Sequence, residues 1–292
     1  MSIAAKDVMK LRQQTGAGMM DCKKALNETN GDFEAAVKYL REKGIASAAK
    51  RAGRSANEGR IVVRVNDDHT AGAIVEVNSE TDFVARNEEF VKTAEAFGDV
   101  AMTFAGKAGD DNLIPVDAFD TTDLQALSGR LGEKMQIARA GYIECDGFVD
   151  NYTHPGDQLG VIIALSGAAA TSDVAKNLAH ELTLQIAAAG PQFVSQDQVP
   201  ESVIEAEKDI YKTQMRNEGK PEEMLDKIAT GKLNKFFEEI CLLNQIFVKD
   251  SKMKVKDVVA QAVKDAGGEI KVDAFLRFKV GDTTSDEEGG EE

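Results

Sequence analysis

The chain has 292 residues, 42% hydrophobic and 29% charged, which is the composition of a globular protein of about two domains. No apolar run reaches the ~20 residues of a membrane span, and no secretory signal or transit peptide is recognisable, so we expect a cytoplasmic protein without a membrane partner. Three widely spaced cysteines without a Cys-x-x-Cys pair argue against a zinc site or a disulfide framework.

The net charge of −15 is unevenly distributed along the sequence. Residues 1–55 carry 11 Lys and Arg against 6 Asp and Glu, whereas the remaining 237 residues carry 24 against 44. The acidic body argues against direct nucleic-acid binding. The basic first part has only Phe33 and Tyr39 as aromatic residues, which favours docking on an acidic protein surface over stacking on RNA bases.

The first part of the chain is predicted to form three short helices. Apolar spacing indicates helices over Ala4–Gln14 and Met19–Thr29, and a third that begins after the capping residue Asp32 and ends at Gly44. A bundle this small is expected to be docked or tethered. The basic, small-residue segment 46–54 is predicted to be a linker.

A β-hairpin and a helix are predicted next. Alternating apolar residues indicate strands at Ile61–Val65 and Ala73–Val77, the pattern of half-buried strands. Asn87 can cap a helix whose apolar stripe extends to Phe104. A further helix is predicted over Thr122–Arg139.

The same order of elements recurs later in the chain. Strands are predicted over Gly141–Val149 and Leu159–Leu165, followed by a helix that Ser172 can cap. We interpret the two strand–strand–helix units as a tandem duplication. A late strand, Leu276–Val280, is predicted to close the second sheet.

The segment between these elements is predicted to be a helical hairpin. Pro200 begins one helix, Asn217–Pro221 turns the chain, and a second helix runs from Glu222 towards Ile240. Its distal part is too charged to build a core, so it should project from the body. The prediction is an α+β protein divided into a three-helix module (1–54), a first core subdomain (55–140), a second core subdomain (141–199 and 233–281), the hairpin (200–232) and an acidic disordered tail (282–292).

Searches for enzyme chemistry find almost nothing. There is no P-loop motif, and Gly16-Ala17-Gly18 lacks the third glycine and the preceding strand of a dinucleotide loop. The three histidines, His69, His154 and His180, are scattered without metal-ligand spacing. We therefore predict no catalytic residue, no metal ligand and no cofactor, and expect a protein that is not an enzyme.

Two segments remain as candidate binding sites. The strand ending at Asn78-Ser79 leads into Asp82-Phe83, which is either a capping aspartate with a core phenylalanine or an exposed recognition anchor. The segment Thr15–Met20 is either an inter-helix turn with core methionines or an adaptable docking surface.

Both segments closely match signatures of the bacterial elongation factor Ts family, over Leu11–Leu26 and Val75–Arg86. Leu184–Ala188 and Lys235–Gln245 resemble later segments of that family. The resemblance implies a ubiquitin-associated-like N-terminal module, two related core subdomains, each an antiparallel sheet with helices, and a hairpin of the dimerisation type. It also implies binding to elongation factor Tu, both GDP-bound and nucleotide-free.

The resemblance further assigns a mechanism and residues. It implies guanine-nucleotide exchange, in which an Asp-Phe wedge displaces Mg²⁺ from Tu and promotes GDP release during translation elongation. The implied wedge residues are Thr81, Asp82, Phe83 and Val84. The implied docking residues of the N-terminal module are Leu11, Arg12, Thr15, Gly16, Ala17, Gly18, Met19 and Met20.

Two other interpretations are kept beside this one. The first is a non-catalytic adaptor or scaffold protein of the ubiquitin-associated type, which would need no exposed Asp82-Phe83. The second is a nucleotide-dependent enzyme. A homodimer through the hairpin is also possible, and the C-terminal helix with which some family members touch Tu is not expected after Val280.

Overall fold

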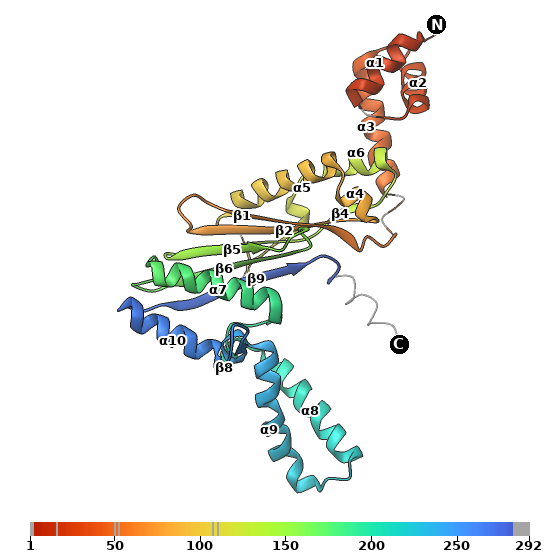
Figure 1. Cartoon of the computed structure of the whole chain (residues 1–292). Helices are drawn as coiled ribbons and strands as arrows, with labels where there is room; N and C mark the ends of the chain where they lie inside the picture. Colours follow the sequence, from red (N-terminus) through yellow and green to blue (C-terminus); the bar gives the residue numbers. More distant parts are fainter. Residues whose placement is uncertain are drawn as a thin grey trace.

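The computed structural model describes residues 3–15, 17–49, 51, 53–106, 108–109 and 111–282, with the side chains of 45–49 excepted. The predicted docking residue Gly16 and all but the first residue of the predicted tail lie outside these ranges. The body is a four-layer sandwich in which helices cover the outer faces of two stacked antiparallel sheets, so the fold is α+β as predicted (Figure 1).

Three helices begin the chain, as predicted: α1 (Ala5–Thr15), α2 (Met19–Glu28) and α3 (Phe33–Ala49). Leu11, Cys22 and Leu26 form the centre of their small core. The prediction that α3 ends at Gly44 is wrong, because the helix continues for five more residues, the last four of them in the expected linker. Gly44 instead lies where α3 crosses α6, and a Cβ built on Gly129 of α6 would lie 2.5 Å from the Gly44 Cα.

The first sheet has the strand order β1-β2-β4-β3. Its strands are β1 (Glu58–Val65), β2 (Ala71–Ser79), β3 (Leu113–Ile114) and β4 (Met135–Glu144), and its covering helices are α5 (Glu88–Ala101) and α6 (Thr122–Leu131). All nine residues of β2 are buried, which makes it the central strand of the body. Phe90 and Phe97 of α5 pack on this sheet, as their spacing predicts.

The predicted helix over Thr122–Arg139 is wrong in its second half. The helix ends at Leu131, because Gly132 takes up the left-handed conformation, with φ of 82°, at its C-cap. Met135 and Ile137 then alternate towards the core as the start of β4. The apolar period thus changes from helix to strand at a glycine.

The second sheet has the order β5-β6-β9, so the predicted closing strand is confirmed. Its strands are β5 (Phe148–Thr153), β6 (Leu159–Ser166) and β9 (Lys271–Lys279), and its covering helices are α7 (Asp173–Ala189) and α10 (Val255–Ala266). The predicted strand over Gly141–Val149 is wrong, because its first part belongs to β4 and its last part to β5. Ile61, Ile74 and Ile162 form part of the core between the sheets.

The two halves share one order of elements. Each has a hairpin followed by a helix, and later a second helix followed by a strand that pairs antiparallel with the second hairpin strand. The topology therefore agrees with the interpretation as a tandem duplication.

A buried ion pair joins the two halves. Glu76 of β2 is completely buried, and its Oε2 lies 2.7 Å from Nε of Arg139 on β4. Its other oxygen accepts a hydrogen bond of 3.0 Å from the backbone N–H of Gly281, just after β9. Arg139 also donates to the Lys279 carbonyl at 3.0 Å. A strand of the first sheet is thereby tied to the end of the second.

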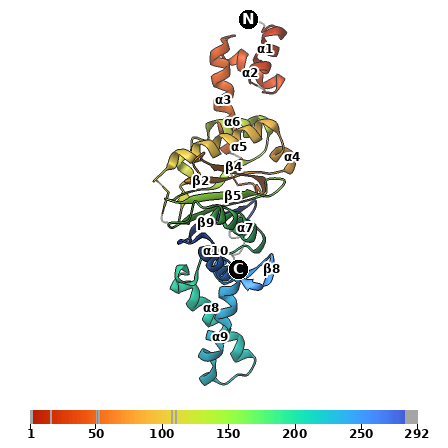
Figure 2. The ribbon, with the colours of Figure 1, turned by 60° about the vertical axis from the view of Figure 1, so that its left-hand side comes forward.

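The helical hairpin projects from the end of the body opposite the three-helix module (Figures 1 and 2). It consists of α8 (Glu201–Asn217) and α9 (Glu222–Ile240), and α9 leads to the small hairpin of β7 (Ile246–Phe247) and β8 (Asp250–Lys254). The described ranges also contain short 3-10 helical turns at Met102–Phe104, Val116–Ala118, Gln196–Gln198 and Leu242–Asn244. The exact subdomain boundaries stay a prediction.

Within the described ranges, no helix combines the length and the apolar character that a membrane span requires. The same part of the chain holds no group of three or more His, Cys, Asp or Glu side chains arranged to bind a metal ion.

We predict that acid loosens the projecting hairpin. Lys212 lies 2.7 Å from Asp226, and Arg216 lies 2.6 Å from Glu222, so each pair links α8 to α9. The hydrogen bonds and charges of Lys212 and Arg216 hold the pKa values of Asp226 and Glu222 below their ordinary values of 3.8 and 4.5. Their contribution to stability is therefore present above those values and is lost as pH falls through the lowered ones.

Amide hydrogen exchange, corrected for intrinsic rates, should show protection in α8 and α9 falling between about pH 6 and pH 3. The double variant Glu222→Gln/Asp226→Asn should show a smaller fall. An equal fall in the variant would assign the acid sensitivity to other groups.

Candidate functional site

Phe83 is the most exposed large apolar side chain among the described residues, with 83% of its surface accessible. It lies in α4 (Asp82–Ala85), a single helical turn that follows the end of β2. The interpretation of Phe83 as a core residue is therefore wrong. Exposing a phenyl ring to water is unfavourable, and such a ring at a turn is typical of an interaction anchor.

Residues on both sides of Phe83 are held by the body. Ala85 is buried, and Val84 packs against the core of the first sheet. Thr81, rather than Asp82, is the N-cap, and its Oγ1 accepts the Val84 N–H at 3.4 Å. Of the predicted wedge residues, Thr81 and Val84 thus fix the turn, while Phe83 points its ring into solvent.

Asp82 is at the surface, where its Oδ2 lies 3.1 Å from Nη2 of Arg86 one turn later. The Asp82 side chain is 40% accessible and that of Arg86 79%. An exposed i, i+4 pair contributes little to stability. The carboxylate can therefore exchange this partner for another without a large loss.

The turn that follows α6 holds the turn that carries Phe83. Glu133 accepts hydrogen bonds from the Thr81 backbone N–H at 3.0 Å and from the Thr81 hydroxyl at 2.8 Å. In the opposite direction, the Lys134 backbone N–H donates to the Glu80 carboxylate. The two turns therefore fix each other.

The N-terminal region reaches the same turn. Arg54 belongs to the segment between α3 and β1, and its Nη1 lies 3.1 Å from Oε1 of Glu80. The hydrogen bond from the Lys134 N–H, and beyond it the Arg54 guanidinium, lowers the pKa of Glu80 against an opposing effect of burial. Glu80 therefore stays ionised at neutral pH and keeps both partners.

The predicted docking residues of the three-helix module divide into two groups. Leu11 is fully buried and Ala17 is 8% accessible, so both belong to the core of the module. The Thr15 hydroxyl donates to the Leu11 carbonyl at 2.7 Å. The exposed group consists of Arg12, Gly18, Met19 and Met20. Met20 is 73% accessible, and two flexible thioethers at a helix start form an adaptable surface.

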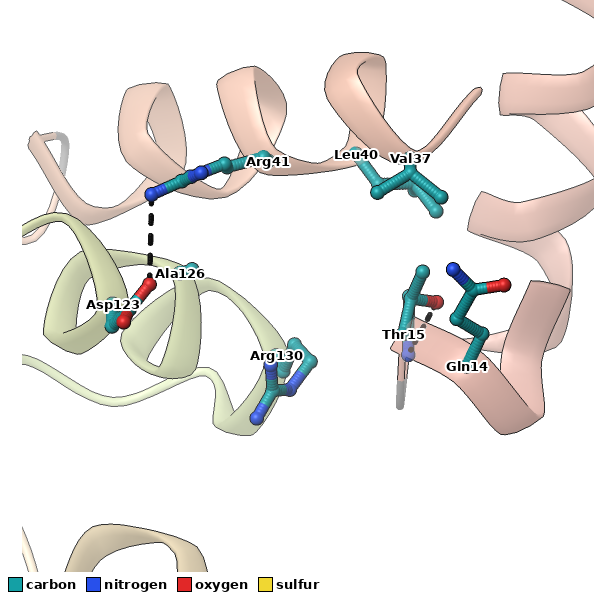
Figure 3. A pocket seen from close by; sticks show the side chains of 9 residues that line it. Gln14, Thr15, Val37, Leu40, Arg41, Asp123, Ala126 and Arg130 are labelled. Carbon is teal, nitrogen blue, oxygen red and sulfur yellow. Dashed lines mark hydrogen bonds and ion pairs between the residues drawn. The ribbon is translucent and has the colours of Figure 1, made fainter. Parts of the chain in front are cut away.

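A pocket of about 270 Å³ lies between this module and α6 (Figure 3). Val37 and Leu40 of α3 line one side, and Ala126 and Arg130 of α6 line the other. Nη2 of Arg41 lies 3.6 Å from Oδ1 of Asp123 across the junction. The pocket thus belongs to the joint between module and body rather than to an enclosed ligand site.

The described cysteines and histidines have structural partners rather than catalytic ones. Burial raises the pKa of Cys241 to about 11 and also raises that of Cys145, which makes both poor nucleophiles at neutral pH. The His69 ring stacks on Phe148 with a centroid distance of 4.9 Å. His180 Nδ1 lies 3.7 Å from Asp150 at the surface.

Sequence reasoning missed Glu133, Lys134 and Arg54 as residues of the site. Glu133 lies 52 positions from Thr81. No local spacing or motif connects the two, and the predicted helix over this region concealed the turn. Only the pairing of β2 with β4 brings the two turns together.

The chain is similar to known proteins over most of its length. Residues 80–282 match the family described as Elongation factor TS. The chain is 44% identical over 284 residues to the Elongation factor Ts of Clostridium botulinum (strain Alaska E43 / Type E3), covering 96% of this chain and 93% of the relative. It is 43% identical over 289 residues to that of Prosthecochloris aestuarii, covering 96% and 99%. The chain therefore belongs to the elongation factor Ts family of translation elongation factors.

Proposed function

We propose that this protein is the guanine-nucleotide exchange factor of elongation factor Tu. The observation that carries the proposal is Phe83, a large apolar ring that is 83% accessible on a turn held from both sides. A preorganised aromatic side chain at the surface is typical of an interface hot spot. The membership of the elongation factor Ts family supports Tu as the partner.

The proposed mechanism is differential binding. If the factor binds nucleotide-free Tu more tightly than Tu–GDP, then it must weaken GDP binding by the same ratio. The Phe83 ring would enter Tu beside its nucleotide site and displace the elements that hold Mg²⁺. Loss of Mg²⁺ removes charge compensation for the phosphates, and GDP leaves. No covalent step is needed, so the protein would not be an enzyme in the chemical sense.

Asp82 would act beside the ring. Its carboxylate has only the exposed pairing with Arg86 to give up, and it would enter the region of Tu that is losing Mg²⁺. Thr81 and Val84 would keep the turn in place. We call residues 81–84 the wedge segment.

The three-helix module would serve as a tethered docking unit. Arg12, Gly18, Met19 and Met20 form its exposed candidate surface, at the end of the molecule away from the hairpin. The projecting hairpin carries Ile210 and Met224, which are 50% and 47% accessible, and these support a proposed role in self-association.

The deciding test is release of a fluorescent GDP analogue from purified Tu. Titrating this protein gives two quantities, the maximal release rate and the half-saturating concentration. Acceleration at substoichiometric amounts, with excess GTP as the incoming nucleotide, would establish exchange. Binding to Tu without acceleration would favour the adaptor function instead.

We predict that Phe83→Ala reduces exchange far more than it reduces folding stability. Losing an anchor ring costs about 2–4 kcal/mol of interface energy, which corresponds to a loss of roughly thirtyfold or more in release efficiency. The melting temperature should change little, because the ring is exposed. Val100→Ala, which truncates another exposed apolar residue, is the control and should leave exchange normal.

We predict that Asp82→Ala slows GDP release while Tu binding changes little. The reason is that Asp82 would act on the Mg²⁺ region rather than as an anchor. Arg86→Ala is the matched control, since it breaks the same ion pair but leaves the carboxylate in place. Equal losses in both variants would show that the ion pair, and not the carboxylate, is needed.

We predict that deleting residues 1–54 raises the half-saturating concentration about tenfold or more and preserves part of the maximal rate. The tethered contact is lost, but the wedge segment remains. Because the deletion also removes Arg54, one of the partners of Glu80, the variant Arg54→Ala in the full chain is the control. A folded deletion variant without any exchange at saturation would contradict the tether model.

A further inference from the structure

The wedge segment has an exposed tip and a tightly bound first residue. Every polar group of Thr81 is engaged within the protein. Its N–H and hydroxyl donate to Glu133, its hydroxyl oxygen accepts from the Val84 N–H, and its carbonyl accepts from Ser79 at 3.0 Å and from the Ala85 N–H at 3.1 Å. Phe83, two residues later, contributes no such contact of its own.

Glu133 lies outside the wedge segment and supplies two of the hydrogen bonds that hold Thr81. It accepts with both oxygens, Oε2 from the Thr81 N–H and Oε1 from the Thr81 hydroxyl, a two-point contact that fixes orientation as well as distance. Hydrogen bonds to a carboxylate are about twice as strong as those between neutral groups.

Glu133 is itself held in position. The Ser128 hydroxyl, which is buried, donates to the Glu133 carbonyl at 2.5 Å. Gly132 supplies the left-handed turn that follows α6. The neighbouring Lys134 N–H donates back to Glu80, the residue before Thr81. The backbone of the turn that carries the carboxylate is thus fixed by the body.

A single-turn helix cannot hold an exposed ring by itself. Helix formation has a costly nucleus, and four residues fall well below the length that is stable alone. Any disorder of the turn in the free protein must be removed on binding, which costs affinity and rate. Contacts that already order the turn in the free protein therefore favour binding, although they do not touch the partner.

From this geometry we propose that Glu133 is a positioning residue, whose two-point contact with Thr81 holds Phe83 in one orientation before the partner arrives. The expected effect of Glu133 on nucleotide exchange rests on the function proposed above. The restriction of the Phe83 side chain in the free protein does not depend on that function.

The first test measures motion of the free protein. The chain contains no tryptophan, so Phe83→Trp introduces a single indole at the tip. Time-resolved anisotropy then reports the local motion of that indole. Adding Glu133→Ala should increase the amplitude of its fast motion. Adding Glu133→Gln should not, because the amide can accept from the Thr81 N–H and donate to the Thr81 hydroxyl oxygen.

Glu269→Ala is the matched control, since it removes an exposed glutamate of the second half that is paired with Lys271 at 3.2 Å. It should leave the indole motion unchanged. If Glu133→Ala does not fold, Thr81→Val, which removes the hydroxyl half of the contact and also the cap on the Val84 N–H, should increase the motion. An unchanged anisotropy in folded Glu133→Ala and Thr81→Val would overturn the proposal.

The second test is a double-mutant cycle in the GDP-release assay, in which Phe83 is the native residue again. Glu133→Ala should lower the maximal release rate about tenfold, with rescue by Glu133→Gln. In the Phe83→Ala background the same change should have almost no further effect, because there is no ring left to orient. A full tenfold loss in that background would show that Glu133 acts otherwise, and would also overturn the proposal.

The two tests separate the two hypotheses. If Phe83→Ala releases GDP normally, the proposed wedge function fails, and the anisotropy alone decides whether Glu133 restrains the tip. If exchange depends on Phe83 but Glu133→Ala leaves the indole motion unchanged, the proposed function stands and the positioning role is wrong.

Discussion

The architecture depends on one buried carboxylate. Glu76 lies in the central strand of the first sheet with no accessible surface, and a charge in that place is tolerable only when it is paired and hydrogen-bonded. Arg139 supplies the opposite charge, and the Gly281 N–H occupies the second oxygen. The guanidinium also lies over the Phe278 ring, 4.3 Å from its centroid. Both sheets must therefore assemble around this group together.

The pairing of Glu76 also helps to place the candidate site, because Glu76 and the wedge segment belong to one continuous stretch of chain. The strand that carries Glu76 ends at Ser79, and Phe83 follows after four residues. Thr81 is held by hydrogen bonds to the body, and Val84 packs against its core. Between them the protein exposes two residues only, a carboxylate and a ring. The function proposed above would require no cavity, because it would depend on the accurate presentation of these two side chains.

The sequence predicted those features that short-range physical chemistry decides. Asn87 and Ser172 cap α5 and α7 as expected, because N-capping depends on nearby backbone groups. The apolar stripe of α5 packs as its period requires. Period alone could not locate the change from α6 to β4, since Met135, four residues after Leu131, also fits a continuing helical face until the glycine at 132 is taken into account.

The site was predictable only in part for the same reason. The pattern around Asp82-Phe83 indicated a strand leading into a helix, but a phenylalanine there fits a core as well as a surface. Its exposure depends on where the neighbouring elements lie. The contact of Glu133 with Thr81 depends on a strand pairing between distant segments, which no local pattern encodes. Gly44 shows the converse, since a residue expected to break a helix is retained inside it for tertiary packing.

The crossing of Gly44 and Gly129 also sets the mechanical properties of the N-terminal module. Two helix backbones meet there without side chains between them, so the separation of the axes is at its minimum. From this crossing the module extends along the first part of α3, from Gly44 back to Phe33, about 17 Å at a rise of roughly 1.5 Å per residue. Asp21, which follows Met20, pairs with Lys43 beside Gly44, so the start of α2 lies close to this crossing. One added methyl group at this crossing would push the two helices apart and change the angle at which the whole module leaves the body, so the orientation of the module depends on the smallest side chain at the point where it is attached.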